Sequence, residues 1–141
     1  MGALKINHAA VWLNIILLHV LGFLWYGPLF GEIWMELEGI SMAALEADPP
    51  GALTWITNFI ASAFPVYVLA WLFVKLDISS WMDGAKYAFI IAFSFNFLSV
   101  MTSDLFAMEP YSLSWITGGF SLFGLTLSGI ILGAWTKRES E

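Results

Sequence analysis

Four long apolar runs determine most of what this chain can fold into. A helix needs about 20 residues to cross the hydrocarbon core of a membrane. Four runs have that length, without an internal acidic residue and with Lys86 near one end as the only basic one: residues 7–26, 53–74, 85–103 and 113–135. Because lipid offers the backbone no hydrogen bonds, each run must satisfy its own as a helix, and the period-two alternation of membrane barrels is absent. We therefore predict an all-α integral membrane protein, a single up-and-down four-helix bundle over residues 1–141.

The composition excludes several classes of function. Only 11% of the residues are charged, against about a quarter in soluble domains, so the charged surface is too small to keep the chain monomeric in water. The net charge of −6 argues against nucleic acid as a partner, because its binders need a basic patch. Cysteine is absent, which excludes disulfides, thiolate metal ligands and cysteine nucleophiles.

The charged residues outside the runs predict the orientation. If the N-terminus is cytoplasmic, that side collects all five basic residues: Lys5, Lys75, Lys86, Lys137 and Arg138. The opposite side then carries only acidic residues: Glu32, Glu36, Glu38, Glu46, Asp48, Asp104 and Glu109. Lys and Arg concentrate in the cytoplasmic loops of membrane proteins. We therefore expect a multi-pass protein of the inner (cytoplasmic) membrane with both termini in the cytoplasm.

The one long outer loop contains a second helical pattern. Gly27-Pro28 ends the first run, because proline cannot continue the hydrogen-bond ladder of a helix. Beyond it, large apolar residues recur at helical spacing, while the glutamates lie mostly off that stripe: Phe30, Ile33, Trp34 and Leu37. This pattern predicts a short amphipathic helix over residues 30–40 that lies in the outer membrane–water interface.

The same segment carries a family resemblance. Residues 24–35 read Leu-Trp-Tyr-Gly-Pro-Leu-Phe-Gly-Glu-Ile-Trp-Met, which resembles the signature of a bacterial membrane family known as Domain of Unknown Function 1761. That family also looks like four hydrophobic spans with a glycine-bearing last helix, here Gly118-Gly119 and Gly129-x-x-x-Gly133. The resemblance supports the four-span topology and implies no activity, cofactor or catalytic residue. The acidic outer loop departs from the family pattern, so a basic role for this surface is in doubt.

Small and polar residues form one seam on each predicted span. From the rise of about 1.5 Å per residue, one layer of this seam falls near the midplane of the bilayer and a second nearer the outside. The midplane layer contains His19, Asn96 and Ser121, and the outer layer contains Asn58, Thr117 and Ser103. Two interpretations are open: a polar site in which His19 binds a ligand or titrates, or groups that hydrogen-bond to one another and set the helix register. We favour the second, and expect a neutral His19 ring bonded to Asn96 and a hydroxyl.

Residues that permit close helix approach lie mainly in the last span: Gly22, Gly124, Ser128, Gly129 and Gly133. Gly129-x-x-x-Gly133 is a close-approach motif. The sequence leaves open whether it packs within the chain or against another subunit in the bilayer.

The sequence does not name a reaction. No serine has the histidine and aspartate partners of a catalytic triad, so we predict no enzyme. His19 lacks a carboxylate partner, so we predict no cofactor; a haem, chlorophyll or metal ion bound by His19 is the alternative. We expect a non-enzymatic inner-membrane protein that associates with itself or serves as an accessory subunit of a larger membrane assembly. Its partners would be the lipid bilayer and copies or other membrane subunits. A small homo-oligomeric transporter or channel around His19 is the competing hypothesis, although intramembrane charges, which usually mark such paths, are absent.

Overall fold

A computed structural model describes residues 2–139 of the chain. Within them, four helical segments are long and apolar enough to cross a membrane: His8–Leu29, Ala52–Lys75, Trp81–Phe106 and Tyr111–Ala134. The all-α prediction is confirmed, and the chain is a multi-pass membrane protein. The third segment extends beyond the predicted limits, because the Ser80 hydroxyl caps its first turn by accepting from the backbone N–H of Asp83 at 3.1 Å, and such a cap is independent of hydropathy.

The first segment consists of α1 (His8–Leu24) and a π-helical turn, η1 (Trp25–Leu29). Asn7 caps the start of α1, its side chain accepting from the N–H of Ala10. Gly27 leaves the helical conformation just before Pro28, as the sequence predicts. The chain therefore changes direction at the end of α1 that lies away from the two terminal strands; we call this end of the molecule outer and the opposite end inner.

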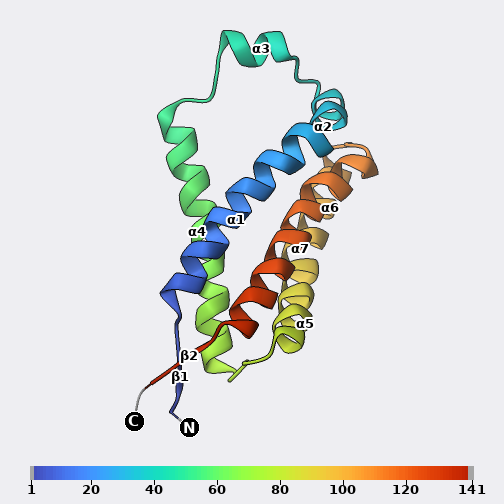
Figure 1. Ribbon diagram of the computed structural model, residues 1–141. Coiled ribbons are helices and arrows are strands. Elements are labelled where there is room, and N and C mark those ends of the chain that lie inside the picture. The colour runs from blue at the N-terminus through green and yellow to red at the C-terminus, as the bar shows by residue number, and fades with distance from the viewer. Residues whose placement is uncertain (1, 140–141) are drawn as a thin grey trace.

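Two short helices, α2 (Gly31–Glu38) and α3 (Met42–Ala47), form an arch at that end (Figure 1). Gly39 ends α2 with a φ of 68°, a left-handed conformation that glycine adopts without steric cost. The Ser41 hydroxyl then caps α3 by accepting from the N–H of Ala44 at 3.1 Å. A helix thus lies within the range predicted for the amphipathic one, and its position in the membrane interface stays a prediction.

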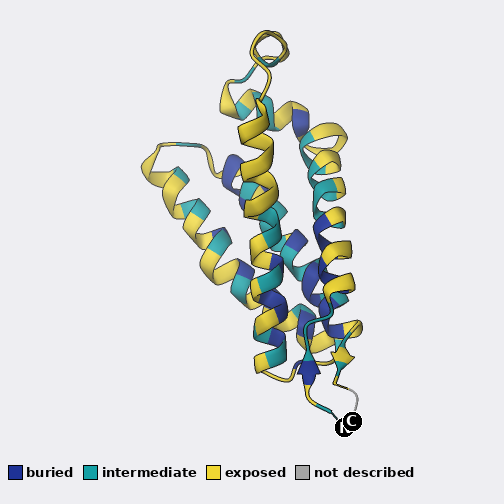
Figure 2. Cartoon of the chain, turned by 90° about the vertical axis from the view of Figure 1, so that its left-hand side faces the viewer, coloured by how far each residue is buried: buried dark blue, intermediate teal, exposed yellow. Residues whose placement is uncertain are grey.

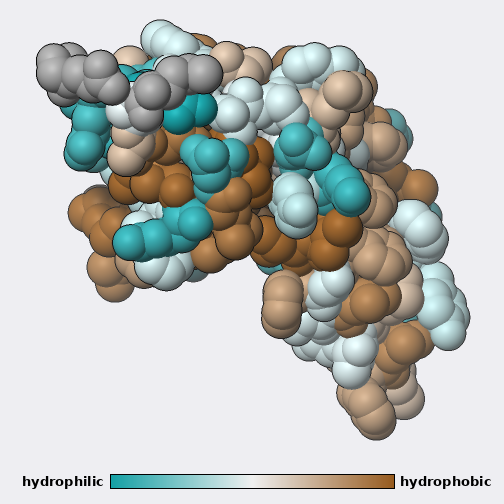
Figure 3. Space-filling model, turned by 90° about the horizontal axis from the view of Figure 1, so that it is seen from below, coloured by the Kyte–Doolittle hydropathy of each residue, from teal (hydrophilic) through white to brown (hydrophobic). Residues whose placement is uncertain are grey.

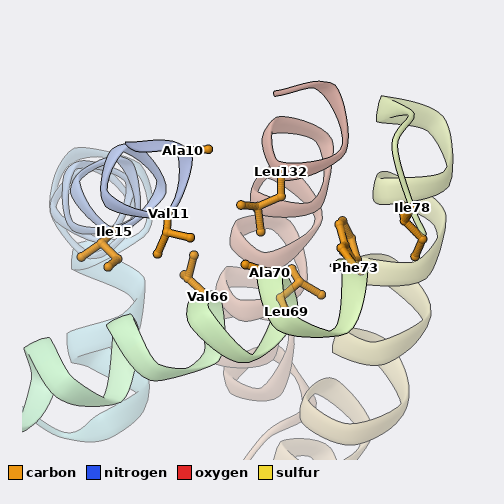
Figure 4. Packing of buried hydrophobic residues seen from close by; sticks show 10 residues of the cluster. Ala10, Val11, Ile15, Val66, Leu69, Ala70, Phe73, Ile78 and Leu132 are labelled. Atoms are coloured by element: carbon orange, nitrogen blue, oxygen red, sulfur yellow. The ribbon is translucent and has the colours of Figure 1, made fainter. Parts of the chain in front are cut away.

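The second span, α4 (Ala52–Lys75), is packed along only half of its length. Its inner half contributes Val66, Leu69, Ala70 and Phe73 to the apolar core, where they meet Val11 and Ile15 of α1 and Leu132 of the last span (Figure 4). The outer half is exposed on every face from residue 51 to residue 61. In Figure 2, it is the helix below the arch and is coloured as exposed around its circumference. Pro65, which cannot donate the backbone hydrogen bond of a regular helix, lies at the boundary between the two halves.

The third span runs through α5 (Trp81–Ile91), the π-helical η2 (Ala92–Phe97) and α6 (Leu98–Phe106), and it packs along α7 (Tyr111–Ala134). Glycines permit this contact: a Cβ at Gly129 would overlap the carbonyl oxygen of Gly84, and one at Gly133 would overlap that of Ser80. The Gly129-x-x-x-Gly133 motif therefore packs within the chain, against α5. This contact resolves the choice that the sequence leaves open.

The two termini lie side by side at the end opposite the arch (Figure 1). β1 (Leu4–Lys5) pairs antiparallel with β2 (Lys137–Arg138). The Arg138 guanidinium donates to the carbonyl of Gly2 at 3.1 Å and lies 3.9 Å from the carboxylate of Asp77, in the loop between α4 and α5. Seen from this end, hydrophilic side chains surround a brown apolar surface (Figure 3). The basic terminal strands and the acidic arch thus occupy opposite ends of the molecule.

Candidate functional site

Polar and aromatic side chains line the side on which α1 and α4 face each other. We call this surface, formed by His19, Phe23, Asn58, Phe59 and Ser62, the α1–α4 face. The two helices touch through their inner halves and diverge toward the arch (Figure 1). Asn58 lies one helical turn outward from Ser62, and Phe23 one turn outward from His19, so each shares a side of its helix with that contact residue. Both Asn58 and Phe23 are exposed, Phe23 to 77%.

The His19 ring is held by its own helix. Its Nδ1 lies 2.8 Å from the carbonyl oxygen of Ile15, one turn earlier. Because a carbonyl only accepts hydrogen bonds, Nδ1 carries a hydrogen and donates it. In a neutral ring the other nitrogen, Nε2, then presents a lone pair toward α4, where the Ser62 hydroxyl lies 3.4 Å away.

Ser62 is a poor donor to that lone pair. Its single hydroxyl hydrogen also has two closer acceptors, the carbonyl oxygens of Asn58 at 2.9 Å and Phe59 at 3.0 Å. A hydroxyl can donate only once, and the shorter contacts are the stronger hydrogen bonds. His19 Nε2 is therefore an acceptor without a good donor among residues 2–139.

Aromatic rings complete the contact between the helices. The Phe59 ring lies 5.6 Å from the His19 ring and stacks on Trp12 with a centroid distance of 6.2 Å. Further inward, His8 Nδ1 lies 3.3 Å from the Tyr67 hydroxyl. The α1–α4 face thus has apolar walls around one oriented imidazole.

The predicted midplane layer does not form as one cluster. The polar partners of His19 are Ile15 and Ser62, not Asn96, because α7 lies between α1 and η2. Asn96 Oδ1 is buried without a partner among residues 2–139. Ala88 meets Gly129 and Phe97 meets Gly118, so the antiparallel pairing of the third span with α7 puts Asn96 at about the level of Ser121. The hydroxyl expected beside His19 is that of Ser62 in α4. The prediction that Asn96 supplies the amide partner is wrong.

The predicted outer layer is dispersed as well. Thr117 donates its hydroxyl hydrogen to the Leu113 carbonyl of its own helix at 3.0 Å. Asn58 and Ser103 are exposed on α4 and α6, two elements without extensive contact. The sequence places these residues at similar depth but does not give the rotation of each helix, and that rotation separates them.

The packing residues of α7 contact more than one neighbour. A Cβ at Gly124 would lie 2.8 Å from Leu18 of α1, and one at Gly22 would lie 3.6 Å from Phe120. Ser128 is 1% exposed, and its hydroxyl oxygen has no partner within the described chain. Gly124 therefore sets the approach of α1 to α7, as Gly129 sets that of α5.

The Trp-Tyr-Gly-Pro segment has a role that sequence reasoning missed. The Trp25 ring nitrogen donates to the Ile116 carbonyl of α7 at 2.9 Å, and the ring contacts Phe30, Phe120 and Phe123. Its position at a predicted membrane boundary suggests an anchor in the lipid headgroups and not a contact with α7. The adjacent helix breaker was the available signal, because a chain that turns there must be held by side chains.

A second missed contact ties the outer ends of the last two spans together. Ser114, which is buried, donates its hydroxyl hydrogen to the Asp104 carboxylate at 2.8 Å. The sequence suggests instead that Asp104 lies in an outer loop, whereas it lies within α6.

Two further features concern metal ions and cavities among the described residues. No three His, Asp or Glu side chains among residues 2–139 gather closely enough to hold a metal ion. A cavity of about 120 Å³ lies between α4, α5 and α7. All the residues that line it have apolar side chains: Pro65, Val68, Leu69, Leu72, Ala88, Ile91 and Leu125. A space of this kind can accept aliphatic groups but offers no polar contact.

Comparison with known proteins gives a family and no activity. A family model described as "Protein of unknown function (DUF1761)" matches residues 9–133. No curated protein and no solved structure matches the chain.

Proposed function

Because the chain belongs to DUF1761, a family of unknown function, we propose its role from the geometry of its helices: a non-enzymatic inner-membrane protein that works by assembly. It associates with copies of itself or serves as an accessory subunit of a larger membrane complex. The observation that carries this proposal is the outer half of α4, in which every residue from 51 to 61 is exposed.

The two halves of α4 differ sharply in their surroundings. Val66 in the inner half is 0% exposed, whereas Leu53 in the outer half is 77% exposed. Lipid alone would suit an entirely apolar helix, but the outer half also carries Thr54, Thr57 and Asn58. A polar side chain in hydrocarbon is stabilised by a hydrogen bond to another helix. The exposed amide of Asn58 therefore supports the presence of a further membrane helix.

The interior supports a role without chemistry. Its polar groups are separated by α7, its apolar cavity offers no donor or acceptor, and the four spans lack a buried charge. Enzymes and ion pathways in membranes usually depend on such charges. A structural subunit does not need them.

A small homo-oligomeric transporter or channel is the second candidate, and one observation favours it. His19 presents Nε2 on a face that the rest of the chain leaves partly open. If copies surrounded this face, the imidazole would contact whatever passes between them. The separation of His19 from Asn96 and Ser121 gives this candidate less support than assembly alone.

The proposed environment follows from the two ends of the molecule. The termini and the loop between α4 and α5 belong to the cytoplasm, where Lys and Arg concentrate. The acidic arch lies on the outside, with α2 in the membrane interface. Phe30 and Ile33 of this arch are exposed in the isolated chain and would be covered by lipid.

Purification in a mild detergent, followed by determination of the protein mass by light scattering, tests the proposal. We expect either a multiple of the 15.7 kDa chain or a stoichiometric complex with other membrane proteins. A monomer without co-purifying subunits, in lipid nanodiscs as well as in detergent, would contradict it. Substrate uptake by vesicles that contain only this protein, lost in His19→Gln, would favour the transporter.

A further inference from the structure

We propose that a second copy of this chain docks on the α1–α4 face, and that the Asn58 amide of each copy donates a hydrogen bond to His19 Nε2 of the other. This inference rests on the self-association arm of the proposed function. It assigns the surface, the occupant and the pair of polar groups that determine specificity.

The acceptor side of the contact is already oriented. The hydrogen bond from Nδ1 to the Ile15 carbonyl fixes the ring and directs the lone pair of Nε2 toward α4. The nearest hydroxyl, that of Ser62, lies 3.4 Å away and has closer acceptors for its hydrogen. In hydrocarbon this lone pair gains from any better donor that reaches it.

The donor side is the Asn58 amide. Asn58 lies one turn outward from Ser62 on the same side of α4, and its side chain hydrogen-bonds to no other residue within 2–139. Its carboxamide carries two N–H donors. An unpaired carboxamide that faces lipid raises the free energy of the protein, because lipid offers no hydrogen bond, and a hydrogen bond to another protein helix removes this penalty.

The two unsatisfied groups are complementary and lie on one surface. In a two-fold symmetric interface, residue i of one copy contacts residue j of the other, and j contacts i. A two-fold axis along the membrane normal leaves each residue at its own depth, and Asn58 lies one turn, about 5 Å, outward from the level of Ser62 and His19. Each Asn58 side chain therefore reaches inward across the interface to the His19 of the other copy, and one contact contains both pairs. Acyl chains carry neither donors nor acceptors, and an unrelated partner would need its own matching pair.

The apolar surroundings suit the same occupant. Phe23 and Phe59 flank the polar groups and are exposed, and so are Ile56 and Ile60 further along α4. Burial of these rings against a second copy would enclose the hydrogen bonds and strengthen them. Because the outer half of α4 is uncovered, a second copy can reach it from the bilayer without unfolding any element.

Cross-linking tests the surface directly, because the chain has no cysteine of its own. Two differently tagged copies, one carrying Phe23→Cys and the other Thr54→Cys, are expressed together in native membranes and treated with a short thiol-specific cross-linker. We expect a mixed dimer. Phe95 is 80% exposed on the third span, away from this face. Phe95→Cys is therefore the matched control and should form no cross-linked dimer.

Substitutions test the polar pair. Asn58→Leu and His19→Leu should each lower the dimer association constant on the order of tenfold, since two interhelical hydrogen bonds are lost. The double variant should associate about as weakly as either single variant, because both substitutions remove the same hydrogen bonds. His19→Gln keeps a hydrogen-bond acceptor, so this variant should associate more strongly than His19→Leu. Thr57→Val is the control: it removes a hydroxyl next to Asn58 and should leave the association constant unchanged. Thermal unfolding monitored by circular dichroism would show whether each variant still folds.

The outcomes separate this inference from the proposed function. An oligomer that forms without the mixed cross-link, or that is insensitive to Asn58→Leu, overturns the assignment of the surface and leaves assembly intact. A single copy that co-purifies with other subunits overturns the second copy as occupant and supports the accessory role. A monomer without any partner overturns both.

Discussion

Trp25 shows how one side chain links distant parts of the fold. It lies where α1 ends, and its ring nitrogen donates to the backbone of α7, while its ring packs against Phe30, which lies between η1 and α2, and against two phenylalanines of α7. Tyr26 contributes to the same junction, since its ring lies 5.2 Å from that of Trp34 in α2 and 5.4 Å from that of Phe120 in α7. A residue in the segment that resembles a family signature thus has a structural role.

Trp25→Phe tests that role, because it keeps an aromatic ring and removes the donor. The Ile116 carbonyl would lose this partner at 2.9 Å, so the free energy of unfolding in detergent should fall by about 1 kcal/mol. Trp71→Phe is the control, since Trp71 is half exposed and its ring nitrogen has no partner within the described chain. Equal losses of stability in the two variants would contradict the role of the hydrogen bond.

At the scale of elements, the four spans differ in how much of their length packs against other helices. α5, η2 and α6 lie along the whole of α7, with glycine backbones in direct contact, whereas all buried residues of α4 lie inward of Pro65. In a membrane, close backbone approach increases van der Waals contact between helices. The α5–α7 pair is therefore the rigid part of the molecule, and the outer half of α4 is the part available to partners.

Gly129→Ala should disrupt the rigid pair. The added Cβ would overlap the Gly84 backbone and force the helices apart, which we expect to cost about 1–3 kcal/mol of unfolding free energy. Gly119→Ala is a control on the same helix, where the Cβ would make an ordinary contact of 3.5 Å with the Trp25 ring. A Gly129→Ala protein as stable as Gly119→Ala would contradict the close contact.

The arch helix α2 offers a second test at this scale. Leu37 lies on its apolar stripe and Glu32, five residues earlier, on the opposite side of the helix, so single cysteines at the two positions can carry an environment-sensitive fluorophore. In lipid bilayers we expect blue-shifted emission from Leu37→Cys and water-like emission from Glu32→Cys. The interfacial placement is wrong if the two emissions coincide.

At the scale of the whole molecule, charge is divided between the two ends. The terminal strands hold Lys5, Lys137 and Arg138, and Lys75 ends α4 on the same side of the molecule, while the arch carries glutamates. An even number of spans brings both termini to the same end. The positive-inside rule then specifies which end faces the cytoplasm.

Single cysteines test this orientation in intact cells. Glu46→Cys and Glu109→Cys should react with a membrane-impermeant maleimide, and Asp83→Cys should react only after the membrane is opened. The chain contains no other thiol, so labelling reports one site at a time. Labelling of Asp83→Cys but not of Glu46→Cys would invert the topology.

The sequence by itself determined the spans, their helical nature and the separation of charge. These properties depend on local composition, because hydrocarbon forces any long apolar segment into a helix whatever its neighbours are. The breaker at Gly27-Pro28 is local for the same reason and can be predicted without knowledge of the other helices. The cap at Ser80 is also local, but hydropathy does not reveal it, so the third span begins before its predicted start.

Only the tertiary structure decided which faces meet. In a soluble helix the apolar stripe marks the buried side, but membrane spans are apolar on almost every side, so the pattern does not give their rotation. His19 therefore faces Ser62 and not Asn96, and Gly129 packs on Gly84 within the chain. The exposure of one half of α4 also follows from packing, because the span is apolar enough along its length to cross a membrane and its hydropathy does not show which half finds neighbours.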